Sequence, residues 1–194
     1  MINLVKGQTI DLKKNTTGGG DFDLSKVTIG LGWDVNERNS GSYDLDAVAA
    51  VLGTNGKMAS SKDLVYYGDK NHPSGNLHLT GDNLTGAGDG DDEQIIVNLE
   101  KLDTKYDKIV FFTSIYQGKQ KGQHFGDVKN AYIRAVDANN KEIAKFEISG
   151  NKDLNDKRSF LFGEVYRKDG TWKFRALGEA KDTDSLSEVA RIYS

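Results

Sequence analysis

The sequence lacks cysteine entirely and contains one proline, Pro73. The absence of cysteine excludes disulfides, thiolate nucleophiles, iron–sulfur clusters and cysteine zinc sites, and it agrees with a reducing compartment. No stretch approaches the ~20 apolar residues of a membrane span. The segment from Met1 to Gln8 also lacks a basic stretch followed by a long apolar run, which a secretory signal requires. We therefore expect a soluble, unexported protein of the cytoplasm.

The charge balance shows no excess of basic residues. Twenty-six lysines and arginines face 29 aspartates and glutamates, giving a formal net charge of -3. Nucleic acid is therefore not expected as a partner, because such partners favour a basic field. Familiar catalytic patterns are missing too: there is no Gly-x-Ser-x-Gly elbow, phosphate loop or dinucleotide fingerprint. His72, His78 and His124 stand outside any recognised zinc spacing, so an enzyme is not expected.

Glycine is abundant, with 22 residues, and the apolar residues between the glycines mostly recur at every second position. This period is typical of β-strands. The clearest alternation runs from Val27 to Val35, which places Trp33 on the core side and Asp34 on the opposite side. With 194 residues and 37% hydrophobic content, we expect one domain, residues 1–194. The predicted fold is a mainly β, two-sheet antiparallel β-sandwich with short helices.

Further strands are predicted wherever this alternation or a continuous apolar run recurs. They are Asp44 to Leu52, Leu64 to Tyr67, Ile95 to Leu99, Lys108 to Tyr116, Ala131 to Val136, Ile143 to Ile148, Phe160 to Arg167 and Trp172 to Leu177. Asp169-Gly170 is predicted to form a hairpin turn. Short helices are expected within Gln123 to Asn130 and from Ser185 to Ile192, with Asp184 as N-cap. Asn15 to Gly20 is expected to be a flexible loop.

One acidic, glycine-rich segment, Gly81 to Glu93, stands out. It carries five carboxylates and four glycines but no lysine or arginine. Two like charges ~4 Å apart repel by about 1 kcal/mol in water and by several times more near a protein surface. A compact loop therefore needs a cation, whereas an open loop would simply be solvated. The glycines allow backbone carbonyls to turn inward, and Asp82 and Asn83 add side-chain oxygens, which favours metal binding.

The donors in this segment are all oxygens, which favours calcium or magnesium over zinc or copper. Flexible backbone and many carboxylates favour calcium, which accepts 6–8 ligands in irregular geometry. The segment is not an EF-hand, because counting from Asp82 puts Leu84, Gly86 and Ala87 where that loop requires other residues. The candidate ligands in it are Asp82, Asn83, Gly86, Asp89, Asp91, Asp92 and Glu93.

A second acidic group lies upstream. Asp44 and Asp46 share one face of a predicted strand, while Leu45 and Ala47 face the other way. Asp34 ends the preceding strand and is expected to join them across a hairpin. These aspartates are either ordinary solvent-facing strand residues or additional ligands of the metal. Because aspartate is disfavoured in strands, their alternation beside an acidic loop suggests shared ligation.

Taken in order along the chain, several motifs resemble the TerD family of tellurite-resistance and stress proteins. They are Gly30-Leu31-Gly32-Trp33-Asp34, Asp44-Leu45-Asp46-Ala47, Val65-Tyr66-Tyr67, His72-Pro73-Ser74-Gly75, Gly81 to Glu93, Phe125 to Arg134, Phe162 to Arg167 and Trp172 to Ala176. The resemblance implies a β-sandwich that binds calcium, commonly two ions, and that acts in tellurium resistance and stress response. The acidic-loop positions, Asp34 and Asp46 are the ligands that it implies.

Two kinds of function remain open. The first is a non-catalytic, calcium-ordered scaffold that docks other stress-complex proteins, some of them membrane-associated. The second is a calcium-dependent hydrolase or a protein that binds a small ligand. Strand-spaced aromatic residues usually belong to a core, but they can line a ligand groove. The aromatic residues in question are Trp33, Tyr66, Tyr67, Phe111, Phe112, Trp172 and Phe174.

Overall fold

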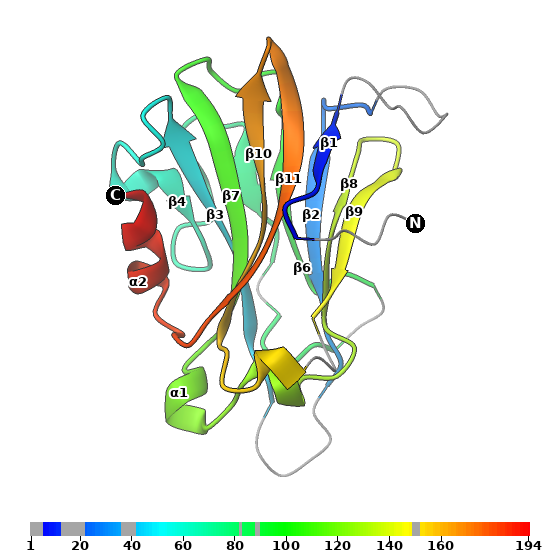
Figure 1. The fold of residues 1–194 in the computed structure, drawn as a ribbon, viewed down its shortest axis with the longest axis vertical. Helices are drawn as coiled ribbons and strands as arrows, with labels where there is room; N and C mark the ends of the chain where they lie inside the picture. The colour runs from blue at the N-terminus through cyan, green and yellow to red at the C-terminus, as the bar shows by residue number, and fades with distance from the viewer. Residues whose placement is uncertain (1–5, 13–21, 36–41, 82, 88–89, 149–151) are drawn as a thin grey trace.

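Two antiparallel sheets packed face to face form the protein. The computed structural model describes residues 6–12, 22–35, 42–81, 83–87, 90–148 and 152–194. Within them, six strands are ordered β1-β11-β10-β7-β3-β4 and five are ordered β5-β6-β2-β8-β9. The fold is therefore a β-sandwich, as predicted from the alternating apolar residues (Figure 1). None of the helices in these segments is long and apolar enough to cross a membrane.

The strands have the following bounds. They are β1 Thr9–Asp11, β2 Val27–Gly32, β3 Leu45–Gly53, β4 Leu64–Val65, β5 Leu77–Leu79, β6 Glu93–Val97, β7 Tyr106–Ile115, β8 Tyr132–Val136, β9 Glu142–Glu147, β10 Ser159–Lys168 and β11 Thr171–Lys181. The helices are α1 Gly118–Lys121 and α2 Leu186–Ala190, with 3-10 turns at Ser61–Asp63, Phe125–Asp127, Lys152–Leu154 and Arg191–Tyr193.

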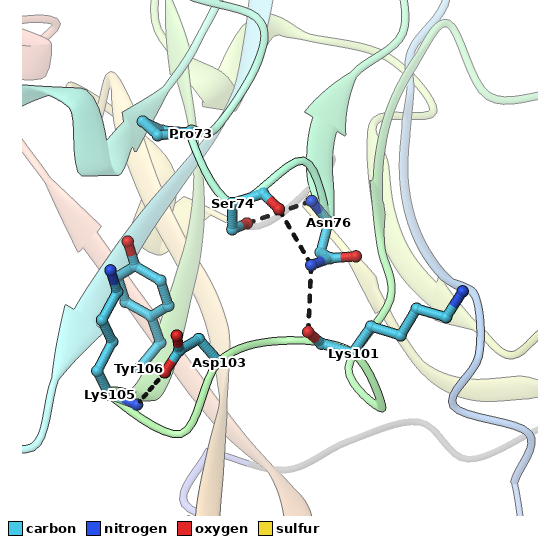
Figure 2. Close-up of a pocket in the computed structure, with 7 residues that line it drawn as sticks. All are labelled: Pro73, Ser74, Asn76, Lys101, Asp103, Lys105 and Tyr106. Carbon is cyan, nitrogen blue, oxygen red and sulfur yellow. Dashed lines mark hydrogen bonds between the residues drawn. The ribbon is translucent and has the colours of Figure 1, made fainter.

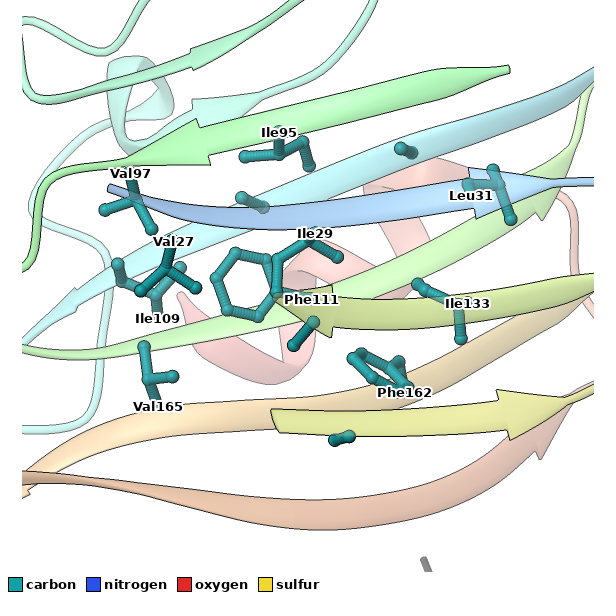
Figure 3. Packing of buried hydrophobic residues seen from close by; sticks show 14 of the residues in the cluster. Val27, Ile29, Leu31, Ile95, Val97, Ile109, Phe111, Ile133, Phe162 and Val165 are labelled. Carbon is teal, nitrogen blue, oxygen red and sulfur yellow. The ribbon is translucent and has the colours of Figure 1, made fainter. Parts of the chain in front are cut away.

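The core lies between the two sheets. Side chains at alternate positions of facing strands enter it from both layers, including Ile29 of β2 and Phe111 of β7 (Figure 3). The central strand β7 is covered on both faces, because Phe111 enters the main core while Phe112 packs against Val189 of α2 on the outer face. This explains the uninterrupted apolar run of Ile109 to Phe112.

The predicted hairpin at Asp169-Gly170 is confirmed. Lys168 pairs with Thr171 across the β10–β11 turn, and both turn residues have positive φ, 54° and 73°. Two central residues with positive φ match the right-handed twist of the flanking strands, and aspartate followed by glycine tolerates this conformation well.

Several sequence expectations were wrong in detail. β2 and β3 belong to different sheets, so Asp34 does not face Asp44 and Asp46 across a hairpin. The N-cap of α2 is Ser185, whose side chain accepts the Glu188 N–H, rather than Asp184. Two short strands, β1 and β5, and helix α1 were not predicted, because three or four residues are too few to show a period. The loop expected at Asn15 to Gly20 lies outside the described residues.

Candidate metal centre

Asp91 lies on the outer face of the five-stranded sheet. Its carboxylate accepts hydrogen bonds from Arg134 Nε at 2.8 Å, from Arg134 Nη2 at 3.0 Å and from the Tyr132 hydroxyl at 3.0 Å. The side chain is only 2% exposed. Burial raises the pKa of Tyr132 to about 12, and the charge of Asp91 adds to this. Arg134 therefore neutralises Asp91 and anchors the end of the acidic loop to β8.

Two glycines of β2 make room for this arrangement. Gly30 alternates with the core residues Ile29 and Leu31, so it faces outward. A Cβ at Gly30 would lie 2.2 Å from the Asp91 carboxylate, and one at Gly32 would lie 2.6 Å from the Tyr132 ring. Because Gly30 and Gly32 have no side chains, the buried Asp91 carboxylate and the Tyr132 ring can pack closely against the backbone of β2.

Asp92 joins the loop to the end of β2. Its Oδ2 accepts the Trp33 backbone N–H at 2.9 Å, and its Oδ1 accepts from Asn83 Nδ2 at 2.8 Å. Asn83 also turns the loop, because its Oδ1 accepts the backbone N–H groups of Thr85 and Gly86 at 3.0 Å each. This is the side-chain-to-backbone pattern by which asparagine stabilises turns. Asp92 is therefore held by neutral donors, unlike Asp91.

Gly86 packs directly against Trp33. Its φ is +73°, and a Cβ at this position would lie 2.5 Å from the indole ring. The Trp33 Nε1–H donates to the Tyr43 carbonyl at 3.0 Å, which fixes the ring. Glycine at position 86 is thus required both by the positive φ and by the close approach of the indole.

Asp34 lies at the exposed end of β2, next to the acidic loop. Its Oδ2 accepts from Asn130 Nδ2 at 2.6 Å. Burial raises the pKa of Asp92, and the negative charges of Asp91 and Asp34 raise it further, although the Trp33 N–H acts in the opposite direction. Asp34, Asp91 and Asp92 are therefore close enough for their negative charges to interact. Asp34 lines an open cleft of about 410 Å³, together with Gly90, Asn130 and the Lys145–Glu147 ion pair.

Glu93 points in another direction, into the sandwich. It is 1% exposed, and its Oε2 accepts the Ala47 N–H at 2.7 Å. This bond ties β6 of one sheet to β3 of the other. Such a buried charge-assisted hydrogen bond has a structural role of its own, whether or not an ion is nearby.

Asp44 and Asp46 lie apart from Asp91. Leu45 and Ala47 enter the main core as predicted, and Asp46 lines a groove on the outer face of the six-stranded sheet. Because Asp91 lies on the outer face of the other sheet, one ion cannot take both Asp46 and Asp91. Asp82 and Asp89 lie outside the described residues. Among the residues that are described, no group of three or more histidines or carboxylates has the geometry of a metal site.

A second polar cluster surrounds His72. His72 Nε2 lies 3.2 Å from Asp63 Oδ1, and His72 Nδ1 lies 2.8 Å from the Ser74 hydroxyl. Nδ1 also accepts the backbone N–H of Ser74, and the hydroxyl accepts the N–H of Asn76. Ser74 and Asn76 line a pocket of about 250 Å³, with Lys101 and Lys105 on its other side (Figure 2). The dense local bonding identifies this cluster as a stabilised turn.

Two groups at the acidic loop were not predicted from the sequence. They are Arg134 and Tyr132, the partners of Asp91, and the glycines Gly30 and Gly32 beneath them. The alternation of two glycines within a strand was the available signal, since glycine in a strand often marks a close approach. The partners come from a strand about forty residues downstream in the sequence and could be found only from the sheet order.

Comparison with known proteins agrees with this architecture. The TerD domain model matches residues 1–193, so the chain belongs to the TerD family, whose members include tellurium resistance and general stress proteins. Tellurium resistance protein TerX of Serratia marcescens is 45% identical, with 99% of each chain covered. General stress protein 16U of Bacillus subtilis (strain 168) is 40% identical, covering 99% of this chain and 96% of that protein.

Solved structures share the fold. A crystal structure of a protein of unknown function superimposes with a TM-score of 0.73 at 26% identity, covering 86% of this chain and 94% of that one. A homologue of the telluride resistance protein TerD from Streptomyces coelicolor A3(2) also gives 0.73, at 21% identity, covering 88% of this chain and 98% of that one. At that identity the second likeness supports the fold alone.

Proposed function

We propose that this protein is a non-catalytic stress-response module that binds calcium at the junction of the acidic loop with the end of β2. The ion would order the surface formed by this junction, and that surface would dock other proteins of a stress complex. The names of the TerX and general stress relatives support the stress role. The calcium site is supported by the carboxylate and backbone oxygens of the acidic loop, which are the kind of ligand that calcium prefers.

The observation that carries the proposal is the uneven neutralisation of three neighbouring acidic side chains, Asp34, Asp91 and Asp92. Asp91 is paired with Arg134. Asp92 and Asp34, in contrast, accept hydrogen bonds from the neutral donors Trp33, Asn83 and Asn130. Burial raises the pKa of Asp92, and the charges of Asp91 and Asp34 raise it further, which means that the ionised side chains repel one another. A divalent cation would remove this repulsion. Oxygen ligands favour calcium or magnesium, and the flexible, glycine-rich backbone favours calcium.

The ligands for this ion would come from both sides of the junction. Asp34 and Asp92 supply carboxylates, and Gly86 supplies a backbone oxygen. Asn83 orients Asp92 through its amide group, and Asp82 and Asp89 are further candidates from the sequence. Asp91 serves as an anchor, because Arg134 already neutralises its charge. The family resemblance implies a second ion, and this geometry assigns no ligands to it.

Calorimetric titration of chelator-stripped protein with calcium, and then with magnesium, tests the proposal. We expect saturable calcium binding and much weaker magnesium binding. Asp34→Asn is the most informative variant, because Asp34 is exposed and its loss should not disturb folding. It should weaken calcium binding by tenfold or more, as one carboxylate ligand is replaced by a neutral oxygen, an effect of about 1.4 kcal/mol.

Asp103→Asn is the matched control, since Asp103 is an exposed loop aspartate that lines the separate pocket of Figure 2. It should bind calcium as the wild type does. Equal affinities in Asp34→Asn, Asp103→Asn and the wild type would contradict the assigned site. Failure of the folded wild type to bind calcium would reject the proposal altogether.

A calcium-dependent hydrolase is the alternative function, and the Asp63–His72–Ser74 hydrogen-bond chain is the observation that favours it. Such a chain resembles the activation of a serine nucleophile. Incubation with a fluorophosphonate probe, with and without chelator, separates the two functions. We expect no labelling, because the Ser74 hydroxyl is engaged in its own turn; labelling lost in Ser74→Ala would favour the hydrolase.

A further inference from the structure

A groove of about 410 Å³ opens on the outer face of the six-stranded sheet, away from the acidic loop. Its walls include three tyrosines, Tyr66, Tyr67 and Tyr116, together with Leu64 and Leu186. Asp46 also lines it and is 3% exposed. Tyr66 and Tyr67 were candidates for a ligand groove from the sequence. The other aromatic candidates from the sequence, such as Phe111 and Trp172, are buried in the core.

The three tyrosine rings meet at right angles. The ring centroids of Tyr66 and Tyr67 are 5.2 Å apart with planes at 80°, and those of Tyr67 and Tyr116 are 5.6 Å apart with planes at 87°. In each pair the rings are in a T-shaped, edge-to-face arrangement, so that successive tyrosines turn by nearly a right angle along the groove. Tyr116 is 37% exposed, unusually for a large aromatic residue, and Lys121 Nζ lies 5.3 Å from its ring centroid. One of the three rings thus already attracts a cation.

The groove is also acidic. Among its described lining residues, the charged ones are Asp46 and Asp184. Burial raises the pKa of Tyr67, and the charges of Asp46 and Asp44 raise it further, so negative potential reaches the tyrosine hydroxyl. Aromatic faces and buried carboxylates attract the same kind of ligand, a cation that sheds its water readily.

We propose that this groove binds a small organic ammonium ion bearing methyl groups on nitrogen and a short alkyl chain. The methylated nitrogen would lie among the tyrosine rings, with Asp46 supplying the compensating charge, and the alkyl chain would lie along Leu64 and Leu186. Quaternary ammonium groups are weakly hydrated and are the ligands that aromatic cages recognise. This site is separate from the proposed calcium site and does not depend on it.

Calcium fits this groove less well than the acidic loop. A calcium ion requires 6–8 oxygens around it, whereas here the walls are rings and leucines. Two of the nearby polar side chains are also engaged, one with α1 and one at the start of α2. Asp184 accepts the Lys119 N–H at 2.8 Å, and the Ser185 hydroxyl caps Glu188. The geometry therefore assigns Asp46 to an organic cation rather than to a metal.

Titration of the chelator-treated full chain with choline tests this assignment. The neutral isostere 3,3-dimethyl-1-butanol, which has the same shape without the charge, serves as the matched ligand. We expect saturable 1:1 binding of choline and binding of the isostere at least about tenfold weaker, because the isostere lacks the cation–π and carboxylate attraction. Absence of saturable choline binding, or equal binding of both compounds, would overturn the proposal.

Variants locate the site. Tyr116→Leu should weaken choline binding about fivefold or more, since one ring is lost from the groove, and its exposed position leaves folding intact. Asp46→Asn should have a similar effect. Tyr166→Leu, a tyrosine of β10 outside the groove, and Asp34→Asn, at the calcium site, should bind choline as the wild type does. Unchanged choline affinity in Tyr116→Leu would contradict the assignment. So would a result in which calcium competes with choline for the wild type and the competition disappears in Asp46→Asn.

Discussion

At the scale of single residues, the least substitutable positions around the acidic loop are glycines rather than carboxylates. Gly30 and Gly32 lie under Asp91 and Tyr132, and a Cβ at either position would overlap them. Gly86 has a positive φ and lies against Trp33. The loop is therefore fixed to the sheet by close contacts that no other residue type permits.

The variant Gly30→Ala tests whether these close contacts hold the acidic loop on the sheet. The added methyl group would lie 2.2 Å from the Asp91 carboxylate, so either that side chain or its pairing with Arg134 must shift. Overpacking of this kind costs about 1–3 kcal/mol. At roughly 2–4 °C for each kcal/mol in a chain of this size, the melting temperature should fall by several degrees.

Gly53→Ala is the matched control for Gly30→Ala. At the end of β3 the nearest atom to the added Cβ is the flexible Asn55 side chain at 3.3 Å. This control should lose well under half as much stability as Gly30→Ala. Equal losses in both variants would show that the close approach of Asp91 to Gly30 has no energetic consequence.

The Asp91–Arg134 pair makes a second prediction at this scale. Arg134→Met keeps much of the aliphatic stem but leaves the carboxylate of Asp91 buried without its cation. Loss of one partner from a fully buried pair costs about 3–5 kcal/mol; here about 2 kcal/mol is expected, because Arg134 is 36% exposed and solvent screens it.

Urea unfolding of Arg134→Met, Asp91→Asn and the double variant measures the coupling of this pair. The double variant should be less destabilised than the sum of the two single variants, since it leaves no buried charge. Additive losses would mean that the two side chains contribute independently.

At the scale of elements, the sequence predicted the long strands and missed the short ones. Alternation, or a continuous apolar run as in β7, was sufficient for β3, β7, β8, β9, β10 and β11, and the Asp169-Gly170 turn was evident from its residue types. The pairing of strands could not be predicted in this way. Asp34 was expected beside Asp44 and Asp46 because β2 and β3 follow one another in sequence, but the two strands enter different sheets.

The candidate site was predictable to a similar extent. The clustering of acidic residues and glycines between Gly81 and Glu93 was visible in the sequence, but the role of each residue was not. Asp91 and Asp92 are neighbours of the same type, yet one pairs with Arg134 and the other accepts from Trp33 and Asn83. The roles of Asp91 and Asp92 can be told apart only from the sheet register, which brings β8 beside β2.

The His72 turn predicts a pH dependence of stability. His72 is fully buried with Asp63, and burial lowers its pKa from the ordinary value of 6.5, although Asp63 acts in the opposite direction. A lowered folded-state pKa means that the neutral imidazole is favoured in the native protein. This contribution is present above pH 6.5 and is lost as the pH falls through the folded-state pKa.

Thermal melting between pH 8 and pH 5 measures this contribution. The wild type should lose stability on acidification more steeply than His72→Gln, in which the titrating group is absent. His78→Gln, a replacement in β5, should follow the wild type. Parallel curves for the wild type and His72→Gln would show that His72 does not contribute to acid sensitivity.

At the scale of the whole molecule, the acidic loop and the tyrosine groove occupy the outer faces of different sheets. The sandwich between them is a continuous apolar core, which includes residues of both layers (Figure 3). Such an architecture can present two independent binding surfaces on one rigid support. The calcium site would then order one surface without altering the other.

Calcium should therefore stabilise the entire fold by mass action. A ligand at one hundred times its dissociation constant adds about 2.7 kcal/mol to the free energy of unfolding. At about 2–4 °C for each kcal/mol, the melting temperature of stripped protein should rise by roughly 5–10 °C on calcium addition. Magnesium at the same concentration should have a much smaller effect, and equal shifts with both ions would indicate unspecific charge screening.

A crystal structure of the calcium-loaded protein, with anomalous scattering to locate the ion, tests the central claim most directly. We expect an ion between the end of β2 and the acidic loop, with oxygens of Asp34 and Asp92 at about 2.3–2.6 Å, and with Asp91 still paired to Arg134. An ion bound instead at Asp44 and Asp46, or no ion at the acidic loop of calcium-saturated protein, would contradict this account.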